Sequence, residues 1–433
     1  MRRRMGGGLW TRNFTILTLG TVVSMLGNAI SGFAVSLMAL DFTGSVFLMV
    51  LVNVVYNLPR VLLPALAGPY LDRFSRVRAI YSLDFLSAAI YALLAGLLFT
   101  GWFRYWLMLL AAPVLGAIDS VYATAYDSLF PTLASKENLP KAYSVSSLIT
   151  PLASAMVPVA AYLYERMGLA PMFAINAASF LAAALFETRI RVREEHLDRP
   201  REAVRLRGYV EDLVQGARYI RAERGLQAIA GYYTLNALLG ACSLLTLPYF
   251  KATPGLGVQW YTYVAGCAVL GRLVGGLAQY RFRVPLGRRF AVALCVYALG
   301  SALDGICLFT PLPAMMVLSF LTGAGYVTSY NIRMSATQAY VPNELRGRFN
   351  GAFAMFTTLG GVVGQLALGA LGDVFNGRTL IAACMGLQRR GRPVAVVEEP
   401  PRRAPGLRRG QGGAGLRAQR KRPRSIGTGP RRA

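Results

Sequence analysis

This sequence contains almost no histidine and lacks a nucleotide-binding loop motif. Its cysteines are far apart from one another along the chain. His196 is the only histidine among 433 residues, which argues against a histidine-ligated metal site or a Ser-His catalytic triad. No GxxxxGK[ST] stretch occurs, so the chain by itself lacks the phosphate-binding loop of ATP-driven machines. The five cysteines lie singly in apolar stretches and predict neither a disulfide framework nor a zinc site. We therefore expect that the chain is not an enzyme and that it binds no metal and no cofactor.

Charged residues are also scarce, at 15% of the chain, whereas hydrophobic residues make up 55%. Soluble globular domains carry about 25% charged and about 45–50% apolar residues. The aromatic share of 11% excludes a wholly disordered chain, because such chains contain few aromatic residues. The composition therefore predicts an integral membrane protein whose main environment is the lipid bilayer.

The formal net charge of +26 is distributed unevenly. Residues 389–433 hold 13 arginines and one lysine against only two glutamates. The remaining excess of positive charge lies in the loops between apolar segments, where basic residues set the orientation of membrane helices. Nucleic-acid binding is therefore only a weak alternative, and it depends on the tail.

Eleven apolar segments reach the ~20 residues that a helix needs to cross a bilayer. They lie near 13–39, 45–66, 79–100, 105–126, 143–164, 170–188, 226–249, 259–280, 290–310, 313–333 and 348–371. A charged interval separates the first six segments from the last five. The predicted fold is an all-α integral membrane protein.

Basic residues are concentrated in alternate loops between these segments. Basic loops follow the second, fourth, eighth and tenth segments, while the loops that alternate with them, at 41–45, 101–104, 165–169, 251–258 and 310–313, are short and nearly neutral. Basic loops remain in the cytoplasm. The pattern predicts a multi-pass protein of the plasma or inner membrane with a cytoplasmic N-terminus.

Two short patterns recur at nearly the same offset. Residues 68–74 (GPYLDRF) follow the second segment, and residues 276–282 (GLAQYRF) follow the eighth, 208 residues later. Residues 137–139 (ENL) precede the fifth segment, and residues 343–345 (NEL) precede the eleventh, 206 residues later. This repeat predicts two pseudo-symmetric six-helix halves, which is how many secondary transporters are built.

The predicted chain has four parts. An N-terminal six-helix half covers residues 1–188, a cytoplasmic linker covers 189–225, an incomplete C-terminal half covers 226–387, and a basic disordered tail covers 388–433. Apolar linker residues recur at helical spacing at Tyr209, Val210, Leu213, Val214, Ala217 and Ile220. They predict an amphipathic helix, which either lies against the inner membrane surface or links the halves as a solvated helix.

The repeat predicts a twelfth span near residue 378, but only nine apolar or small residues follow, at 379–387. Nine residues cannot cross a bilayer. The chain then becomes rich in Arg, Gly, Pro and Ala, and arginine outnumbers lysine 42 to 4 in the whole sequence. We therefore hypothesise that residues from about 388 on are translated out of frame. The alternative is a genuine basic tail that binds anionic lipid or nucleic acid.

Residues 68–78 (GPYLDRFSRVR) resemble the loop signature of the major facilitator superfamily, roughly G-x-x-x-D-R-x-G-R-[RK]. Residues 12–14 (RNF), 24–28 (SMLGN) and 341–348 (VPNELRGR) resemble its siderophore- and macrolide-type exporter branch. The resemblance covers about residues 9–387. Ser75 and Val77 depart from the loop signature.

The resemblance implies a conformational gate in this loop. In the superfamily, the aspartate of the signature, here Asp72, meets the N-terminal end of a span-eleven helix, where the helix dipole favours negative charge. This contact closes the cytoplasmic side and breaks when the cavity opens inward. The gate motif comprises Gly68, Asp72, Arg73, Arg76 and Arg78.

Ionisable groups inside a membrane are costly and therefore candidates for function. Asp119, Tyr122 and Tyr126 share one face of the fourth segment by their spacing, and a carboxyl group in a low-dielectric site can exchange a proton during transport. The alternative is a purely structural, capped Asp119. Asn28 stands where many relatives carry an aspartate, which puts one common proton-coupling position in doubt.

Three further charges lie within the segments. Arg272 and Asp304 are expected to pair across helices, and Asp84 lies near the cytoplasmic end of the third segment. Aromatic and amide groups suit a cavity for an amphipathic organic molecule, although helix–helix hydrogen bonds are the competing explanation for the amides. The candidates in the C-terminal half are Tyr232, Asn236, Tyr326 and Tyr330.

These observations predict a secondary transporter, namely a proton-coupled exporter of small amphipathic molecules that works by alternating access. The expected partners are a small-molecule substrate, protons and the lipid bilayer. An importer or facilitator of the same fold, or a non-functional truncated transporter, remains the alternative.

Overall fold

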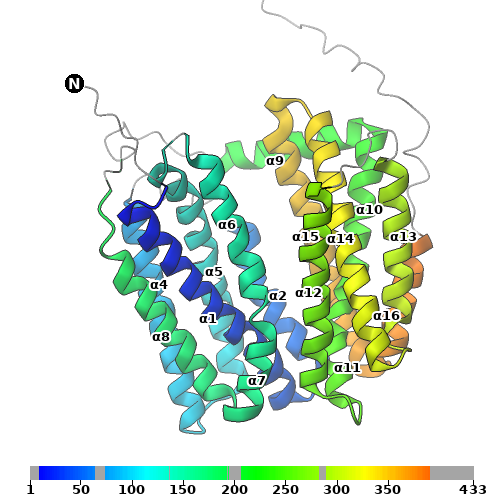
Figure 1. The fold of residues 1–433 in the computed structure, drawn as a ribbon, viewed down its shortest axis with the longest axis horizontal. Coiled ribbons are helices and arrows are strands. Elements are labelled where there is room, and N and C mark those ends of the chain that lie inside the picture. Colours follow the sequence, from blue (N-terminus) through cyan, green and yellow to red (C-terminus); the bar gives the residue numbers. More distant parts are fainter. Residues whose placement is uncertain are drawn as a thin grey trace, which may run out of the picture. The chain divides into compact units, whose positions relative to one another are not determined.

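The computed structural model describes residues 9–63, 74–135, 137–192, 194, 206–281 and 289–390. All regular secondary structure in these ranges is helical (Figure 1). The α-helices are α1 (Arg12–Thr43), α2 (Val46–Leu62), α4 (Arg76–Phe99), α5 (Tyr105–Leu129), α6 (Leu139–Ser154), α7 (Val157–Met167), α8 (Leu169–Glu187), α9 (Leu206–Ala222), α10 (Arg224–Gly240), α11 (Thr246–Ala252), α12 (Val258–Arg281), α13 (Arg289–Cys307), α14 (Leu312–Tyr340), α15 (Asn343–Val374) and α16 (Gly377–Arg390). Two 3₁₀ helices, η1 (Phe130–Leu133) and η3 (Ala241–Leu245), extend α5 and join α10 to α11.

Seven helical stretches in the described ranges are long and apolar enough to cross a membrane. They are Arg12–Thr43, Arg76–Phe99, Tyr105–Leu133, Leu169–Glu187, Arg224–Ala252, Val258–Ala278 and Gly347–Val374. Three shorter apolar helices are Val46–Arg60, Cys295–Cys307 and Leu312–Thr328. The structure thus supports a membrane protein, while the count of eleven spans remains a prediction.

The fifth predicted segment is divided into α6 and α7. Pro158 stands in the first turn of α7, where its missing N–H removes no helical hydrogen bond. The seventh segment is likewise divided into α10, η3 and α11. Both breaks lie in segments that the sequence predicts as single helices, because apolar patterning does not reveal where a helix is interrupted.

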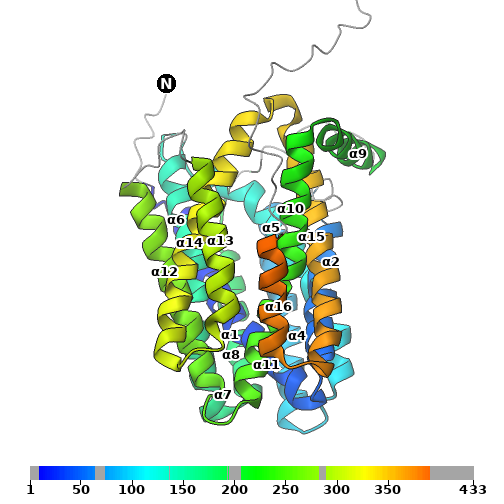
Figure 2. The same ribbon diagram turned by 90° about the vertical axis from the view of Figure 1, so that its right-hand side faces the viewer.

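The helices associate as two groups, which Figures 1 and 2 show in two orientations. In the first group α1 and α4 pack on α8, and α2 packs on α5. In the second group α12 and α13 pack on α14, and α10 packs on α15. The groups meet where α2 packs against α15 and where α7 packs against α12.

The turn between α1 and α2 lies at one end of the bundle, which we call the α1–α2 end. Gly44 has a left-handed φ of 67° and ends α1, because its N–H bonds to the carbonyl of Leu40 at 2.8 Å. Ser45 then caps α2 by accepting the N–H of Leu48. A glycine suits this position since other residues rarely adopt a left-handed backbone.

The opposite end, which we call the α9 end, carries α9 across the ends of α10 and α15 (Figure 2). Ala217, Tyr219 and Ile220 of α9 pack on the bundle, and Ile220 is only 4% exposed. The last described helix, α16, has 14 residues. At 1.5 Å per residue it measures about 21 Å, shorter than the ~30 Å hydrocarbon core of a bilayer.

Candidate functional site

Asp119 of α5 is held next to α2. The two helices approach closely at Gly116, where an added Cβ would lie 1.8 Å from the carbonyl oxygen of Tyr56. One helical turn later the Tyr56 hydroxyl donates a hydrogen bond to the Asp119 carboxylate. Arg60, one turn further along α2, acts on the same carboxylate by its charge. The sequence identified Asp119 but could not predict that it pairs with Tyr56, since the two residues lie 63 positions apart.

Tyr122 and Tyr126 share the α5 face but have different partners from Asp119. The Tyr122 hydroxyl lies 3.2 Å from the hydroxyl of Thr21 and donates to a Glu187 carboxylate oxygen at 3.4 Å. Tyr126 stacks on Phe130, with ring centroids 5.2 Å apart. Tyr122 and Tyr126 also stack on each other, with ring centroids 6.4 Å apart, so the predicted stripe divides into a tyrosine pair and Asp119, which contacts α2.

Glu187, at the end of α8, is a buried carboxyl group that sequence analysis missed. It is 0% exposed, and the neighbouring Asp84 of α4 is 1% exposed. The two carboxyl groups lie within hydrogen-bonding reach of each other, and such a bond requires a proton on one of them. Glu187 is the only acidic residue in the apolar segment 170–188; this isolated charge was the signal that could have identified it.

A cavity of about 560 Å³ lies among α10, α12, α13, α14, α15 and α16. This volume is within the ~300–1,000 Å³ typical of small-molecule sites. Of the sequence candidates, it brings together Asn236, Arg272, Asp304 and Tyr326. The Arg272 guanidinium lies over the Tyr326 ring, 5.6 Å from its centroid.

The expected ion pair between Arg272 and Asp304 is not among the contacts of the described residues. Arg272 acts on Asp304 through its charge, and the Thr322 hydroxyl, on the same cavity wall, donates to the Ser319 carbonyl at 3.2 Å. Both charged groups line the cavity. They are thus available to a polar ligand.

A second cavity of about 340 Å³ lies between α2 and α15, lined in part by Asn57 and Arg60. Gly361 and Gln365 of α15 line both cavities. A polar surface therefore runs from Asn57 and Arg60 of α2 across α15 to the larger cavity, and Asp119 is not a lining residue of either cavity.

Other sequence candidates lie away from these cavities or outside the described part of the structure. Asn28 accepts a hydrogen bond from Asn176 at 3.4 Å, which joins α1 to α8. The ring of Tyr232 packs edge-on against Tyr297, a residue of the cavity wall, at 5.7 Å. The side chain of Tyr330 lies outside the described residues.

The structure describes the loop of residues 68–78 only from Phe74 on, so Gly68, Asp72 and Arg73 of the gate motif lie outside the described residues. Glu194 caps the first turn of α4 by accepting the Ser75 hydroxyl and the Arg76 N–H, the latter at 2.7 Å. The Arg76 guanidinium donates to the Ser128 carbonyl at 3.2 Å. Arg78 is exposed. Glu194 is thus another functional candidate that the sequence did not identify.

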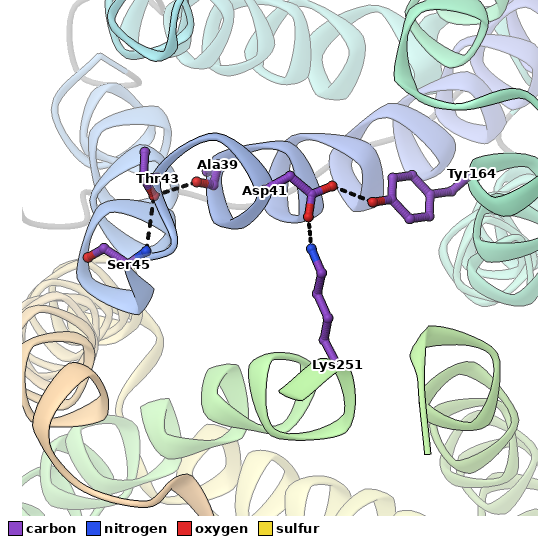
Figure 3. Close-up of polar contacts among 6 residues, drawn as sticks. All are labelled: Ala39, Asp41, Thr43, Ser45, Tyr164 and Lys251. Atoms are coloured by element: carbon purple, nitrogen blue, oxygen red, sulfur yellow. Dashed lines mark hydrogen bonds and ion pairs between the residues drawn. The ribbon is translucent and has the colours of Figure 1, made fainter. Parts of the chain in front are cut away.

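The two helix groups are joined at the α1–α2 end. Lys251 of α11 forms an ion pair with Asp41 of α1, and the Tyr164 hydroxyl of α7 donates to the other oxygen of Asp41 (Figure 3). Gln259 of α12 also donates to Glu165 of α7. We call the ion pair of Asp41 and Lys251, with Tyr164, the latch.

Asp373, near the end of α15, holds the first turn of α2. Its carboxylate accepts the Ser45 hydroxyl and the Val46 N–H, both at 2.6 Å, and the Phe47 N–H at 3.3 Å. A carboxylate is favoured at this place because the N-terminal end of a helix carries partial positive charge. This contact joins the two groups at the same end as the latch.

Comparisons with known proteins agree with this arrangement. A family profile described as Major Facilitator Superfamily matches residues 17–365. Macrolide efflux protein A of Streptococcus pyogenes is 22% identical over 343 residues, covering 74% of this chain and 81% of that protein. Multidrug efflux pump Tap of Mycobacterium tuberculosis (strain ATCC 25618 / H37Rv) is 26% identical over 391 residues, covering 86% and 91%.

Solved structures show the same fold. A bacterial homologue of the iron transporter ferroportin in its inward-facing state has a TM-score of 0.62 at 17% identity, covering 88% of this chain and 97% of that one. The nucleoside transporter NupG has a TM-score of 0.64 at 13% identity, with the same coverage. In the described residues of this chain, no group of three His, Cys, Asp or Glu side chains could hold a metal ion. The chain belongs to the Major Facilitator Superfamily, and it is a membrane transporter rather than an enzyme.

Proposed function

We propose that this chain is a proton-coupled exporter of small amphipathic organic molecules. The observation that carries the proposal is the polar surface that runs from Arg60, whose charge acts on Asp119, across α15 into a cavity of about 560 Å³. Aromatic rings with a few polar groups suit an amphipathic organic ligand. Two efflux proteins among its relatives favour export over import.

The proposed architecture has two pseudo-symmetric halves that rock against each other where α2 meets α15. Eleven spans cross the membrane, with a short twelfth helix, and the N-terminus is cytoplasmic. The α9 end then faces the cytoplasm and the α1–α2 end faces outward. In this orientation the latch and the Asp373 contact close the outer side.

Asp119 is the proposed proton carrier. Its carboxylate accepts the Tyr56 hydroxyl and lies near the Arg60 charge, so protonation would change the contact between α2 and α5. Because α2 also packs on α15, that change would reach the surface where the two groups meet. Substrate binding and protonation of Asp119 would thereby act on the same conformational change, which couples their transport.

Transport by the purified chain in vesicles containing a pH-sensitive dye tests the proposal. A panel of amphipathic compounds is added after a pH gradient is imposed, and both dye response and compound accumulation are measured. We expect at least one compound to accumulate and to release protons, and Asp119→Asn to abolish accumulation while leaving binding measurable. Compound movement without any proton flux would identify a facilitator, and a folded chain that binds and moves no compound would support the truncated, non-functional alternative.

A further inference from the structure

A groove of about 680 Å³ lies where α9 meets α10 and α15, away from the polar cavities. Its wall is almost wholly apolar and includes Val214, Leu235, Leu238 and Phe356. The transport site does not use this surface. A groove of this size is large enough for an organic ligand.

The groove has a fixed wall because α9 is tightly packed against α15. Gly216 of α9 is so close to α15 that an added Cβ would lie 2.0 Å from the Arg348 carbonyl oxygen. Ile220 of α9 is buried against Leu226 and Phe349 in one apolar cluster. Helix α9 is therefore firmly packed on this side of the bundle. Figure 2 shows it at the ends of α10 and α15.

Two arginines border this apolar surface. Arg218 and Arg221 are three residues apart on α9, so they share a face of the helix, and both line the groove. Among the described residues, no acidic side chain lines the groove and no carboxylate forms an ion pair with either arginine. The groove thus combines two positive charges with an apolar surface beside membrane-spanning helices.

We propose that this groove binds one anionic phospholipid, whose phosphate contacts Arg218 and Arg221 and whose acyl chain lies along α10 and α15. Apolar lining matches the acyl chain, and the positive charges match the headgroup. Basic residues beside membrane helices attract anionic lipid in this way. The basic C-terminal residues of the chain would be repelled by the same two arginines, so charge favours lipid over the tail as occupant.

Gly231 offers a way to fill the groove without disturbing the fold. It lines the groove, and an added Cβ there would meet no atom within 4 Å. Gly96 of α4 is equally open and lies on a different helix, so Gly96→Trp is a matched control for Gly231→Trp. Arg104→Gln with Arg166→Gln, near the opposite end, controls for the loss of two charges in Arg218→Gln with Arg221→Gln.

Binding of phosphatidylglycerol and phosphatidylcholine to the purified full chain is measured by native mass spectrometry. We expect phosphatidylglycerol to bind in preference to phosphatidylcholine. The loss of two basic residues in Arg218→Gln with Arg221→Gln should weaken its binding at least about tenfold, and Gly231→Trp should weaken it by filling the groove, while both controls leave it unchanged. The proposal would be overturned if the two lipids bound equally well. It would also be overturned if either Gly231→Trp or Arg218→Gln with Arg221→Gln bound phosphatidylglycerol as well as the parent protein does.

A photoreactive phenylalanine analogue at position 231 identifies the occupant in vesicles that contain phosphatidylglycerol. We expect a covalent lipid adduct. A crosslink to the chain's own C-terminal residues, or to a second copy of the chain, would instead assign the groove to that occupant and overturn the proposal. Because the readout is binding, its failure is independent of whether the chain transports any compound.

Discussion

Lys251 and Asp41 are 210 positions apart in the sequence, yet they form the ion pair that joins the two helix groups at the α1–α2 end. Tyr164 donates to the same Asp41 carboxylate from a third helix (Figure 3). The two charged side chains are 31% and 27% exposed, so water still reaches them. A partly exposed pair of this kind contributes only a modest stabilisation, which suits a contact that must break in each transport cycle.

The first prediction concerns this latch. Lys251→Met removes the ion pair and should increase opening at the α1–α2 end by roughly two- to fivefold, the effect of a partly exposed salt bridge. The measurement is the labelling rate of a cysteine introduced at Asn236 by a membrane-impermeant reagent added from that side, in a background where the native cysteines are serine. The exchanged pair Asp41→Lys with Lys251→Asp should restore slow labelling. An unchanged rate in Lys251→Met would show that the ion pair does not contribute to closure.

Asp373 should contribute more than the latch to closure at the α1–α2 end. Asp373→Ala removes three hydrogen bonds from the first turn of α2, and loss of such a helix cap costs about 0.5–2 kcal/mol. We expect faster labelling at the same cysteine, with a smaller effect for Ser45→Ala, which leaves both backbone contacts in place. Equal labelling of Asp373→Ala and the parent protein would contradict the proposed closing role.

Tyr56 should assist the proton-carrying carboxylate of Asp119. Tyr56→Phe removes the hydrogen bond to Asp119 but keeps the ring, so a transport assay driven by a pH gradient should show a reduced proton-to-substrate ratio and near-normal substrate binding. Tyr105→Phe is the matched control, since its hydroxyl donates to the Leu48 carbonyl at 2.9 Å. If both variants couple as well as the parent protein, the Tyr56 contact is structural.

The larger cavity can be filled at Gly300. This residue lines the cavity, and an added Cβ there would meet no atom within 4 Å. Gly300→Trp should therefore abolish binding and transport of the substrate while the unfolding temperature stays close to that of the parent protein. Gly96→Trp controls for an added aromatic ring on an open helical surface. Normal transport by Gly300→Trp would exclude this cavity as the substrate site.

Glu187 should be important for folding. Glu187→Ala leaves Asp84 buried without its carboxyl partner, and an unsatisfied buried polar group costs about 1–3 kcal/mol. Glu187→Gln retains a hydrogen-bond donor toward Asp84 and should be tolerated better. Thermal unfolding of the two variants in detergent checks this order. Equal unfolding temperatures would show that the two carboxyl groups do not depend on each other.

Several properties could be predicted from local sequence. Apolar runs and scarce charge indicate membrane helices because burying charge in lipid is costly, and residues 68–78 indicated the family that the comparisons confirm. Asp119 was conspicuous as an acidic residue within an apolar segment. Each of these features depends on the residue and its immediate neighbours, so no knowledge of the folded arrangement is needed.

Contacts between distant segments could not be predicted in the same way. The sequence indicated one polar face on α5, but Asp119 contacts α2 whereas Tyr122 contacts α1 and α8. It also predicted a pair between Arg272 and Asp304, whereas the structure leaves both facing one cavity. The sequence analysis did not single out Glu187, which is 0% exposed, because hydropathy alone cannot distinguish a helix end at the membrane surface from one buried against other helices.

The amino-acid sequence by itself thus determined which segments are apolar, where the loops carry positive charge, and to which family the chain is related. Only the tertiary structure decided which polar groups meet, as Lys251 meets Asp41 and Tyr56 meets Asp119. Hydropathy acts on each segment separately through its transfer from water to lipid. Hydrogen bonds and ion pairs depend on distances of a few ångströms between helices, which are set by close contacts such as that of Gly116 with Tyr56.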